Sequence, residues 1–237
     1  MVLRLIPASL VLGPAVLLPF VLVALGACSG SNDASIFPAA QPDAAAACTP
    51  VPLDASYKPV WKKPTTAAAG KCNATQLQGF YQACLLGPLT GSACTSFVMA
   101  NGDCSSCLQS DDTDPAYSAV IWHSDRAFYT FNTAGCIADQ EGDDSATGCG
   151  AAYQAAVECE ETACSACGVA DYGLFPTCEK NASAECSTYI QALNSVCGSG
   201  LRDAGDPAAD CTLVSSAQAA FLAIAPVFCG TPPGAGP

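Results

Sequence analysis

Two Cys-x-x-Cys motifs have the residue types and spacing that could carry chemistry: Cys104-Ser105-Ser106-Cys107 and Cys164-Ser165-Ala166-Cys167. A Cys-x-x-Cys pair at a helix N-terminus can have a lowered thiol pKa and can exchange disulfides. In redox enzymes that use it, the motif lies between a strand and a helix of an α/β domain, and the surrounding sequence predicts no such domain. We interpret both motifs as structural disulfide cysteines, with thiol-redox activity as the alternative.

The same four cysteines also form a Cys₄ zinc ligand set by type, because thiolates are common zinc ligands. The separation between Cys107 and Cys164 is far longer than in a compact zinc ribbon, and export into an oxidising space opposes retained thiolates. Neither motif is followed by histidine, which excludes c-type haem attachment. We therefore expect no cofactor and no metal, with metal handling kept alongside redox activity in the alternative.

Few other residues qualify for catalysis or metal binding. The only histidine, His123, precedes Ser124 and Asp125. Neighbours in sequence cannot ordinarily adopt catalytic-triad geometry, so we interpret His123 as a turn residue. Acidic clusters at residues 111–114 and 139–144 offer oxygen ligands for calcium, but the glycine of the second is misplaced for an EF-hand loop. We interpret both clusters as solvated turns and predict that the chain is not an enzyme.

The start of the chain combines a positive charge at Arg4, an uncharged apolar run over residues 5–25 and the sequence Leu25-Gly26-Ala27-Cys28. A basic start, an apolar stretch and small residues before a cut are typical of a secretory signal. The last four residues resemble the lipobox of bacterial lipoproteins. That resemblance implies cleavage before Cys28, a diacylglycerol and an acyl chain on Cys28, and, with Ser29 next, sorting to the outer membrane. An uncleaved transmembrane anchor is the alternative.

The chain has 17 cysteines, and the sixteen besides Cys28 lie between Cys48 and Cys229. An even number of cysteines in an exported chain predicts a disulfide framework, whose connectivity cannot be deduced from sequence. The disulfide candidates are Cys48, Cys72, Cys84, Cys94, Cys104, Cys107, Cys136, Cys149, Cys159, Cys164, Cys167, Cys178, Cys186, Cys197, Cys211 and Cys229.

Charge narrows the range of partners. The chain carries 21 acidic residues against 8 Lys and Arg, a formal net charge of −13. Such a surface repels phosphate backbones, so we expect no nucleic-acid binding. The expected partners are the membrane, through the lipid anchor, and a protein or surface ligand whose identity the sequence does not give.

Composition divides the chain into four parts. We predict a signal peptide over residues 1–27, a lipidated Cys28 with an Ala/Pro-rich tether to residue 70, a disulfide-rich body over 72–229 and a flexible tail over 230–237. Near the end of the tether, residues 57–64 combine two aromatic rings with three lysines. We interpret this segment as an extended strap that packs on the body, with a short interaction motif as the alternative.

The body contains an internal repeat in its cysteine spacing. The first copy comprises Cys72, Cys84, Cys94, Cys104 and Cys107, and the second comprises Cys136, Cys149, Cys159, Cys164 and Cys167. Gaps of 11, 9, 9 and 2 residues in the first copy compare with 12, 9, 4 and 2 in the second. Each copy closes with a Cys-Ser-x-Cys motif, so the spacing predicts two related units.

Segments between the cysteines have helical periodicity. Apolar residues share one face at Leu77, Phe80, Tyr81 and Cys84, and again at Cys186, Tyr189, Ile190, Leu193 and Cys197. We expect Ser183 to cap the second of these helices and Gly198 to end it. Further helices are predicted from Asp206-Pro207 and over residues 215–229.

One stretch departs from this pattern. Residues 119–131 contain two β-prone runs on either side of a polar turn, which predicts a β-hairpin packed on the helices. The predicted fold is thus a mainly α, disulfide-rich domain with two cysteine repeats and a hairpin.

Over residues 72–229, the cysteine spacing and the Asn132-Thr133-Ala134-Gly135-Cys136 stretch resemble cysteine-rich exported proteins of myxobacteria. That resemblance implies no particular activity. We expect a membrane-anchored lipoprotein of the cell envelope that acts as a binding or structural module.

Overall fold

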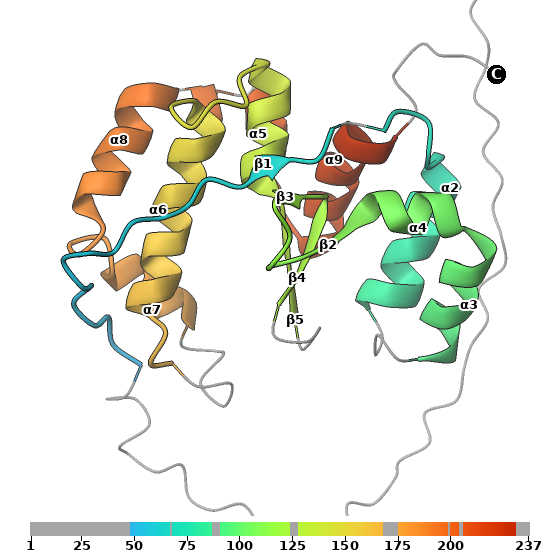
Figure 1. The fold of residues 1–237 in the computed structure, drawn as a ribbon, viewed down its shortest axis with the longest axis horizontal. Helices are drawn as coiled ribbons and strands as arrows, with labels where there is room; N and C mark the ends of the chain where they lie inside the picture. The colour runs from blue at the N-terminus through green and yellow to red at the C-terminus, as the bar shows by residue number, and fades with distance from the viewer. Residues whose placement is uncertain are drawn as a thin grey trace, which may run out of the picture. The chain divides into compact units, whose positions relative to one another are not determined.

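The structure, a computed structural model, describes residues 48–66, 68–86, 91–123, 128–167, 175–198, 200–203 and 206–230. The predicted signal segment, Cys28 and the first part of the tether lie outside these ranges. Helices dominate the described residues, which confirms the predicted mainly α fold (Figure 1). In the same ranges, no helix combines the length and the apolar character needed to cross a bilayer.

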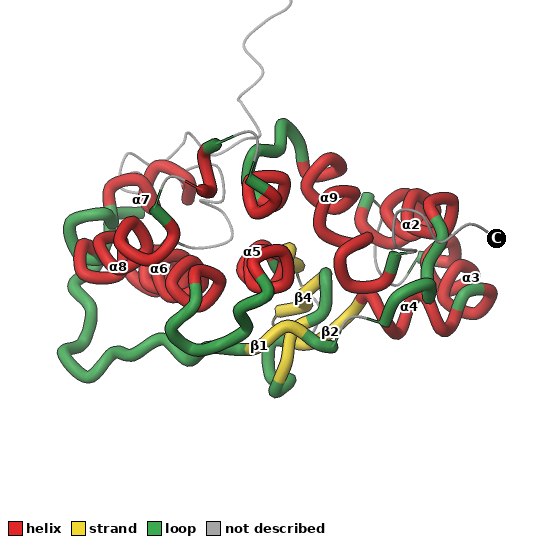
Figure 2. Tube along the Cα trace, turned by 90° about the horizontal axis from the view of Figure 1, so that it is seen from above, coloured by secondary structure: helices red, strands yellow, loops and turns green. Residues whose placement is uncertain are grey.

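The helices form neighbouring groups on the two sides of α5. In chain order the α-helices are α2 (Ala74–Phe80), α3 (Ser92–Ala100), α4 (Gly102–Leu108), α5 (Thr133–Glu141), α6 (Cys149–Ala163), α7 (Phe175–Asn181), α8 (Ser187–Cys197) and α9 (Ala217–Cys229). Shorter helices are the π-helix η1 (Tyr81–Leu85) and the 3₁₀ helices η3 (Gly200–Arg202) and η4 (Pro207–Cys211). Figure 2 shows α6, α7 and α8 on one side of α5 and α9, α2, α3 and α4 on the other.

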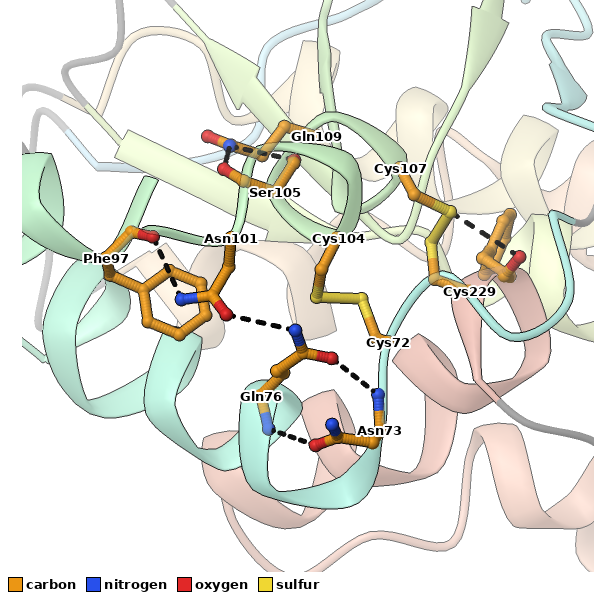
Figure 3. Close-up of a disulfide and its surroundings, with 11 residues drawn as sticks. Cys72, Asn73, Gln76, Phe97, Asn101, Cys104, Ser105, Cys107, Gln109 and Cys229 are labelled. Carbon is orange, nitrogen blue, oxygen red and sulfur yellow. Dashed lines mark hydrogen bonds between the residues drawn. A yellow bond between two sulfur atoms is a disulfide. The ribbon is translucent and has the colours of Figure 1, made fainter. Parts of the chain in front are cut away.

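Local capping explains where α2 begins. The Asn73 side chain accepts a hydrogen bond from the Gln76 backbone N–H, and the Gln76 side chain accepts one from the Asn73 backbone N–H, which completes a capping box (Figure 3). The Gln76 amide also donates to the Asn101 side chain at 3.0 Å, which connects the start of α2 to the segment before α4. Asn73 and Gln76 therefore cap the first turn of α2, and Gln76 also holds it next to Asn101.

Helix α8 begins later than its sequence indicates. The prediction that Ser183 caps this helix is wrong, because the N-cap is Cys186 and residues 182–186 form turns. Backbone hydrogen bonds join these turns to the end of α7, and the Cys159–Cys186 bridge ties them to α6. Gly198 ends the helix at a φ of 57°, as predicted, because a residue without a Cβ adopts this conformation readily.

Two groups of buried side chains organise the described residues. The larger lies among α2, η1, α4, α9 and the sheet, and an aromatic cluster occupies its centre. Phe221 packs 5.9 Å from Phe80, 5.7 Å from Tyr81 and 6.0 Å from Phe131, measured between ring centroids. Burying such a ring contributes about 1.5–3 kcal/mol. The smaller group gathers cysteines and alanines of α6 and α7 with Tyr189 and Ile190 of α8.

Short strands lie between the helix groups. The strands are β1 (Lys63–Pro64), β2 (Gln109–Asp111), β3 (Ala116–Tyr117), β4 (Val120–His123) and β5 (Phe128–Phe131). Strands β4 and β5 pair antiparallel, which confirms the predicted hairpin, and β2 adds to β4 in parallel. Trp122 is buried on β4 and its indole N–H donates to Gln109 at 2.9 Å. Strand β4 is therefore the central strand of a three-stranded sheet, with β2 and β5 at its edges.

The sixteen cysteines from Cys48 to Cys229 are all paired, in eight disulfides. The pairs are Cys48–Cys167, Cys72–Cys104, Cys84–Cys94, Cys107–Cys229, Cys136–Cys211, Cys149–Cys197, Cys159–Cys186 and Cys164–Cys178. So many disulfides imply an oxidising environment outside the cytoplasm.

The two cysteine repeats use their cysteines differently. In the first copy, Cys72 bonds to Cys104 and Cys84 bonds to Cys94, so four of its five cysteines pair within the copy. In the second copy every cysteine bonds outside the copy, to Cys48 or to the block that follows residue 177. Similar cysteine spacing in the two copies therefore does not lead to the same disulfide pairing.

Removing the Cys107–Cys229 bridge should destabilise the fold more than removing Cys84–Cys94. The first joins positions 122 residues apart and the second positions 10 apart. Because Cys136–Cys211 shortens the larger loop to roughly 50 residues, chain entropy predicts a difference of about 1–2 kcal/mol. Urea unfolding of C107A/C229A and C84A/C94A measures it, and equal losses would contradict the explanation.

Candidate functional site

The first Cys-x-x-Cys motif lies on α4 and does not close on itself. Cys104 bonds to Cys72, and Cys107 bonds to Cys229 (Figure 3). Cys104 is buried, so its sulfur is shielded from a partner thiol in solution. The motif fastens α4 to the residue before α2 and to the end of α9, which is the arrangement of structural bridges.

The second motif follows α6 and also bonds outside itself, with Cys164 joined to Cys178 and Cys167 joined to Cys48. The Sγ atoms of Cys48, Cys167 and Cys178 lie within 4.8 Å of one another. Since all these sulfurs are in disulfides, they are not available here as thiolate ligands. The two motifs belong to different buried groups, so the alternative Cys₄ zinc site is not assembled from them.

Each acidic cluster lies where a regular element ends and a turn or loop begins. The backbone N–H of Asp111 donates to the Asp114 carboxylate at 2.8 Å, and the backbone N–H of Ser145 donates to Asp143 at 3.0 Å. The interpretation as turns holds for residues 112–114 and 142–144. It is wrong for Asp111, the last residue of β2, and for residues 139–141, which form the last turn of α5.

His123 is placed differently from its sequence interpretation. The assignment as a turn residue is wrong, because His123 is the last residue of β4. Ser124 and Asp125 lie outside the described residues. Among the described residues, Asp112 forms an ion-pair contact with the imidazole, with Oδ2 3.5 Å from Nδ1. Parallel pairing of β2 with β4 brings Asp112, the residue after β2, beside the end of β4.

His123 borders a pocket of about 260 Å³ between the sheet and α6. Its wall combines polar and apolar side chains. The lining residues are Asp112, Tyr117, Ile121, His123, Thr130, Phe131, Asn132, Thr133, Ala134, Tyr153, Gln154, Val157, Glu158 and Glu161. A pocket with apolar walls and a few convergent polar groups is the usual form of a small-ligand site.

The imidazole at one end of the pocket is held on three sides. Its Nε2 lies 2.8 Å from the Thr130 hydroxyl, and its ring stacks on Phe128 at 4.7 Å between centroids. Burial lowers the pKa of His123, and the Asp112 charge only partly opposes this effect. The ring is therefore neutral at pH 7. With its proton on Nδ1 toward Asp112, Nε2 can accept the hydroxyl of Thr130.

Helix α6 supplies the opposite wall. Tyr153, Gln154, Val157, Glu158 and Glu161 recur at helical spacing and so share one face. Burial and then repulsion from neighbouring glutamates raise the pKa of Glu161 to about 7. Burial also raises the pKa of Glu158, against hydrogen bonds from Gln154 and Val60. No hydrogen bond or ion pair reaches the Glu161 carboxylate from the described residues.

Tyr117 shows that the pocket has a negative potential. Burial and the charges of Glu158, Asp112, Asp114 and Glu161 raise the pKa of Tyr117 to about 12. A nearby cation would interact favourably with the same carboxylates. A cation already contacts this ring outside the pocket, because Nζ of Lys62 lies 5.4 Å from its centroid.

The predicted strap is hydrogen-bonded to one lining residue of this pocket, Gln154. Gln154 donates to the Val60 carbonyl at 2.9 Å and accepts from the Lys62 backbone N–H at 3.3 Å. Both aromatic rings of the strap also contact the body: the Trp61 indole donates to the Asp144 carbonyl, and Tyr57 packs edge-on against Tyr189. The segment therefore packs on α6 as a strap. A second cavity of about 330 Å³ lies beside it, and Gln154 lines both cavities.

The arrangement is suited to binding a cation with an apolar body. Carboxylates offer charge, and tyrosine, phenylalanine and valine side chains offer apolar contact. The oxygen and nitrogen donors are too far apart to ligate one metal ion together among the described residues, which favours an organic cation over a metal. Thr130 hydrogen-bonds to the histidine, but the site presents no cysteine or serine nucleophile.

Sequence reasoning did not identify this site. The available signal is that Glu158 and Glu161 share a helical face with Tyr153 and Gln154. This face is polar and charged, although the helix as a whole is rich in alanine. The partner wall carries no such signal, because Asp112 and His123 are brought together only by strand pairing. The predicted lipidation site, Cys28, lies outside the described residues.

Glu161→Gln should stabilise the fold at pH 8 and have little effect at pH 4. A raised pKa means that folding favours the protonated carboxyl, so the free energy of unfolding falls as pH rises from the ordinary glutamate pKa of 4.5 through about 7. Screening by solvent reduces the gain to about 1–2 kcal/mol, since one pKa unit is about 1.4 kcal/mol. Thermal melts at both pH values measure it.

The control is Glu185→Gln, which changes an exposed carboxylate on a turn remote from the pocket in sequence. An equal gain from both variants would show a general effect of net charge and not a local effect at Glu161.

Comparison with known proteins gives no relative from which a role could be transferred. No protein-family model, curated protein or solved structure matches the chain. Its function is therefore inferred from its own residues and contacts.

Proposed function

We propose that the chain is a lipid-anchored protein of the bacterial cell envelope that binds a small organic cation in the pocket between α6 and the sheet. The observation that carries the proposal is the pair of carboxylates Glu158 and Glu161, set among aromatic and apolar side chains. Burial raises the pKa of both carboxyls, and repulsion from Glu179, Glu158 and Glu160 raises that of Glu161 further. Bringing a positive charge to this wall removes that repulsion.

The size of the pocket limits the ligand. A volume of about 260 Å³ is at the lower end of small-molecule sites. It suits roughly ten non-hydrogen atoms, which corresponds to an alkyl- or arylammonium ion or to a single basic side chain. The rings of Tyr117, Tyr153 and Phe131 would contact the apolar part, while the charge faces α6.

Support for the anchor comes from the sequence. The Leu25-Gly26-Ala27-Cys28 lipobox resembles that of lipoproteins, and eight disulfides require the oxidising space that export provides. Two or more acyl chains hold a protein stably at a membrane. We place the protein at the outer membrane because Ser29, not aspartate, follows the lipidated residue.

Binding, not catalysis or thiol-redox chemistry, is the activity we propose. Each cysteine of both Cys-x-x-Cys motifs is bonded outside its motif, so the alternative requires a state with different pairing. The histidine is neutral and its nitrogens face Asp112 and Thr130, which fits a role in shaping the pocket wall.

The 2-phenylethylammonium ion is expected to bind with a Kd of about 0.1–1 mM at pH 8, as judged by its size. The uncharged 2-phenylethanol, which has nearly the same shape, should bind at least about tenfold more weakly. Binding should also weaken at pH 5.5, where the Glu161 carboxyl, with its pKa of about 7, is protonated. Isothermal titration of the mature protein measures all of these values.

Two variants locate the binding. E158Q/E161Q should lose about tenfold or more in affinity for the ammonium ion and leave the alcohol unchanged, while Glu185→Gln on an exposed turn should match the wild type. Equal affinity of the wild type for the ion and the alcohol would contradict the cation-binding proposal.

The anchor is tested separately by mass. The protein extracted from bacterial membranes should begin at Cys28 and carry the mass of a diacylglycerol and an acyl chain. The C28A variant should lack that mass, because it has no thiol to carry the diacylglycerol. A wild-type protein that retains residues 1–27 would show instead an uncleaved anchor.

A further inference from the structure

We propose that the bridges Cys48–Cys167 and Cys164–Cys178 form a thiol-reactive pair, in which a thiolate enters at Cys167 and the four sulfurs re-pair as Cys164–Cys167 and Cys48–Cys178. The inference does not depend on the pocket, because it rests on a different group of atoms. It assigns to the second Cys-x-x-Cys motif a property that the first motif does not share.

Proximity of sulfurs is the first observation. Sγ of Cys178 lies within 4.8 Å of the Sγ atoms of both Cys48 and Cys167, although it is bonded to Cys164. Disulfide exchange proceeds by attack of a thiolate on a neighbouring disulfide sulfur, so it needs a third sulfur close by. Here each bridge provides that third sulfur for the other.

Access is the second observation. Cys167 is partly exposed, whereas Cys164 and Cys178 have no exposed surface and Cys48 is 8% exposed. A thiolate from solution can therefore reach this group of sulfurs at Cys167. Exchange beyond that first step must then use sulfurs that are already inside the protein.

Backbone geometry supports the new Cys164–Cys167 bond. The backbone N–H of Cys167 donates to the Cys164 carbonyl at 2.9 Å, which defines a four-residue turn. The end Cα atoms of such a turn are less than about 7 Å apart, and disulfides span about 4.4–6.8 Å between Cα atoms. The turn thus brings both cysteines within bonding range without a rearrangement of α6.

The exchange balances without an external oxidant. A low-molecular-weight thiolate attacks Sγ of Cys167, forms a mixed disulfide and releases the Cys48 thiolate. Cys48 then attacks Sγ of Cys178 and releases the Cys164 thiolate. Cys164 attacks Sγ of Cys167, closes the Cys-x-x-Cys bond and returns the original thiolate. Two protein disulfides are present before and after, so the entering thiolate is a catalyst.

The first motif is a matched control within the same chain. Cys104 and Cys107 also stand three residues apart, but with their partners Cys72 and Cys229 they form no group of three sulfurs this close in the part of the chain that is described. The same spacing should therefore be inert there.

Disulfide mapping of the native mature protein tests the proposal. The protein is incubated with reduced glutathione at pH 8, quenched in acid, digested with pepsin and analysed by mass spectrometry, with circular dichroism as a check on folding. We expect new Cys164–Cys167 and Cys48–Cys178 linkages, with Cys72–Cys104 and Cys107–Cys229 unchanged.

A double variant isolates the first step. In C164S/C178S, Cys48 has no second bridge to attack, so a glutathione adduct should accumulate at Cys167 while Cys48 becomes open to alkylation. Wild-type protein that keeps only its original pairs and gains no adduct at Cys167 would overturn the proposal. Equal exchange at Cys104 and Cys107 would also overturn it, because proximity would then not be the cause.

Discussion

Covalent links between distant segments determine how this small, alanine-rich fold is held together. Cysteine and alanine supply much of both buried groups, and these side chains bury less apolar surface than leucine or phenylalanine. Helices as short as α2, α4 and α7 are marginal in isolation, so tertiary contacts must support them. Bridges such as Cys107–Cys229 and Cys48–Cys167 join positions more than 100 residues apart and reduce the entropy of the unfolded chain.

A fold stabilised in this way can tolerate unfavourable electrostatics. Burial raises the pKa of Glu161 on α6 to about 7, and repulsion from Glu179, Glu158 and Glu160 contributes to this shift. Such repulsion costs free energy at neutral pH, and unneutralised carboxylates in a confined site are typical of functional positions. Aromatic rings, the histidine and Asp112 on the side of the sheet complete a pocket in which both walls combine polar and apolar groups.

The sequence predicted local structure well and long-range pairing poorly. The stripe at Leu77, Phe80, Tyr81 and Cys84 and the hairpin at residues 119–131 depend on periodicities of a few residues, and both are present. The start of α8 was misplaced because a bridge at Cys186 sets it, and bridges depend on the whole fold. His123 was misassigned for the same reason, since its contact with Asp112 arises from the pairing of two separate strands.

The position of Cys48 has a mechanical consequence. Any tension in the chain that precedes Cys48 meets the Cys48–Cys167 bond first and passes into the turn after α6. The hydrogen bonds between the strap and Gln154 lie beyond that junction, so a pull on the chain before Cys48 leaves them unloaded. The wall that Gln154 contributes to the pocket is in this way isolated from forces applied through that part of the chain.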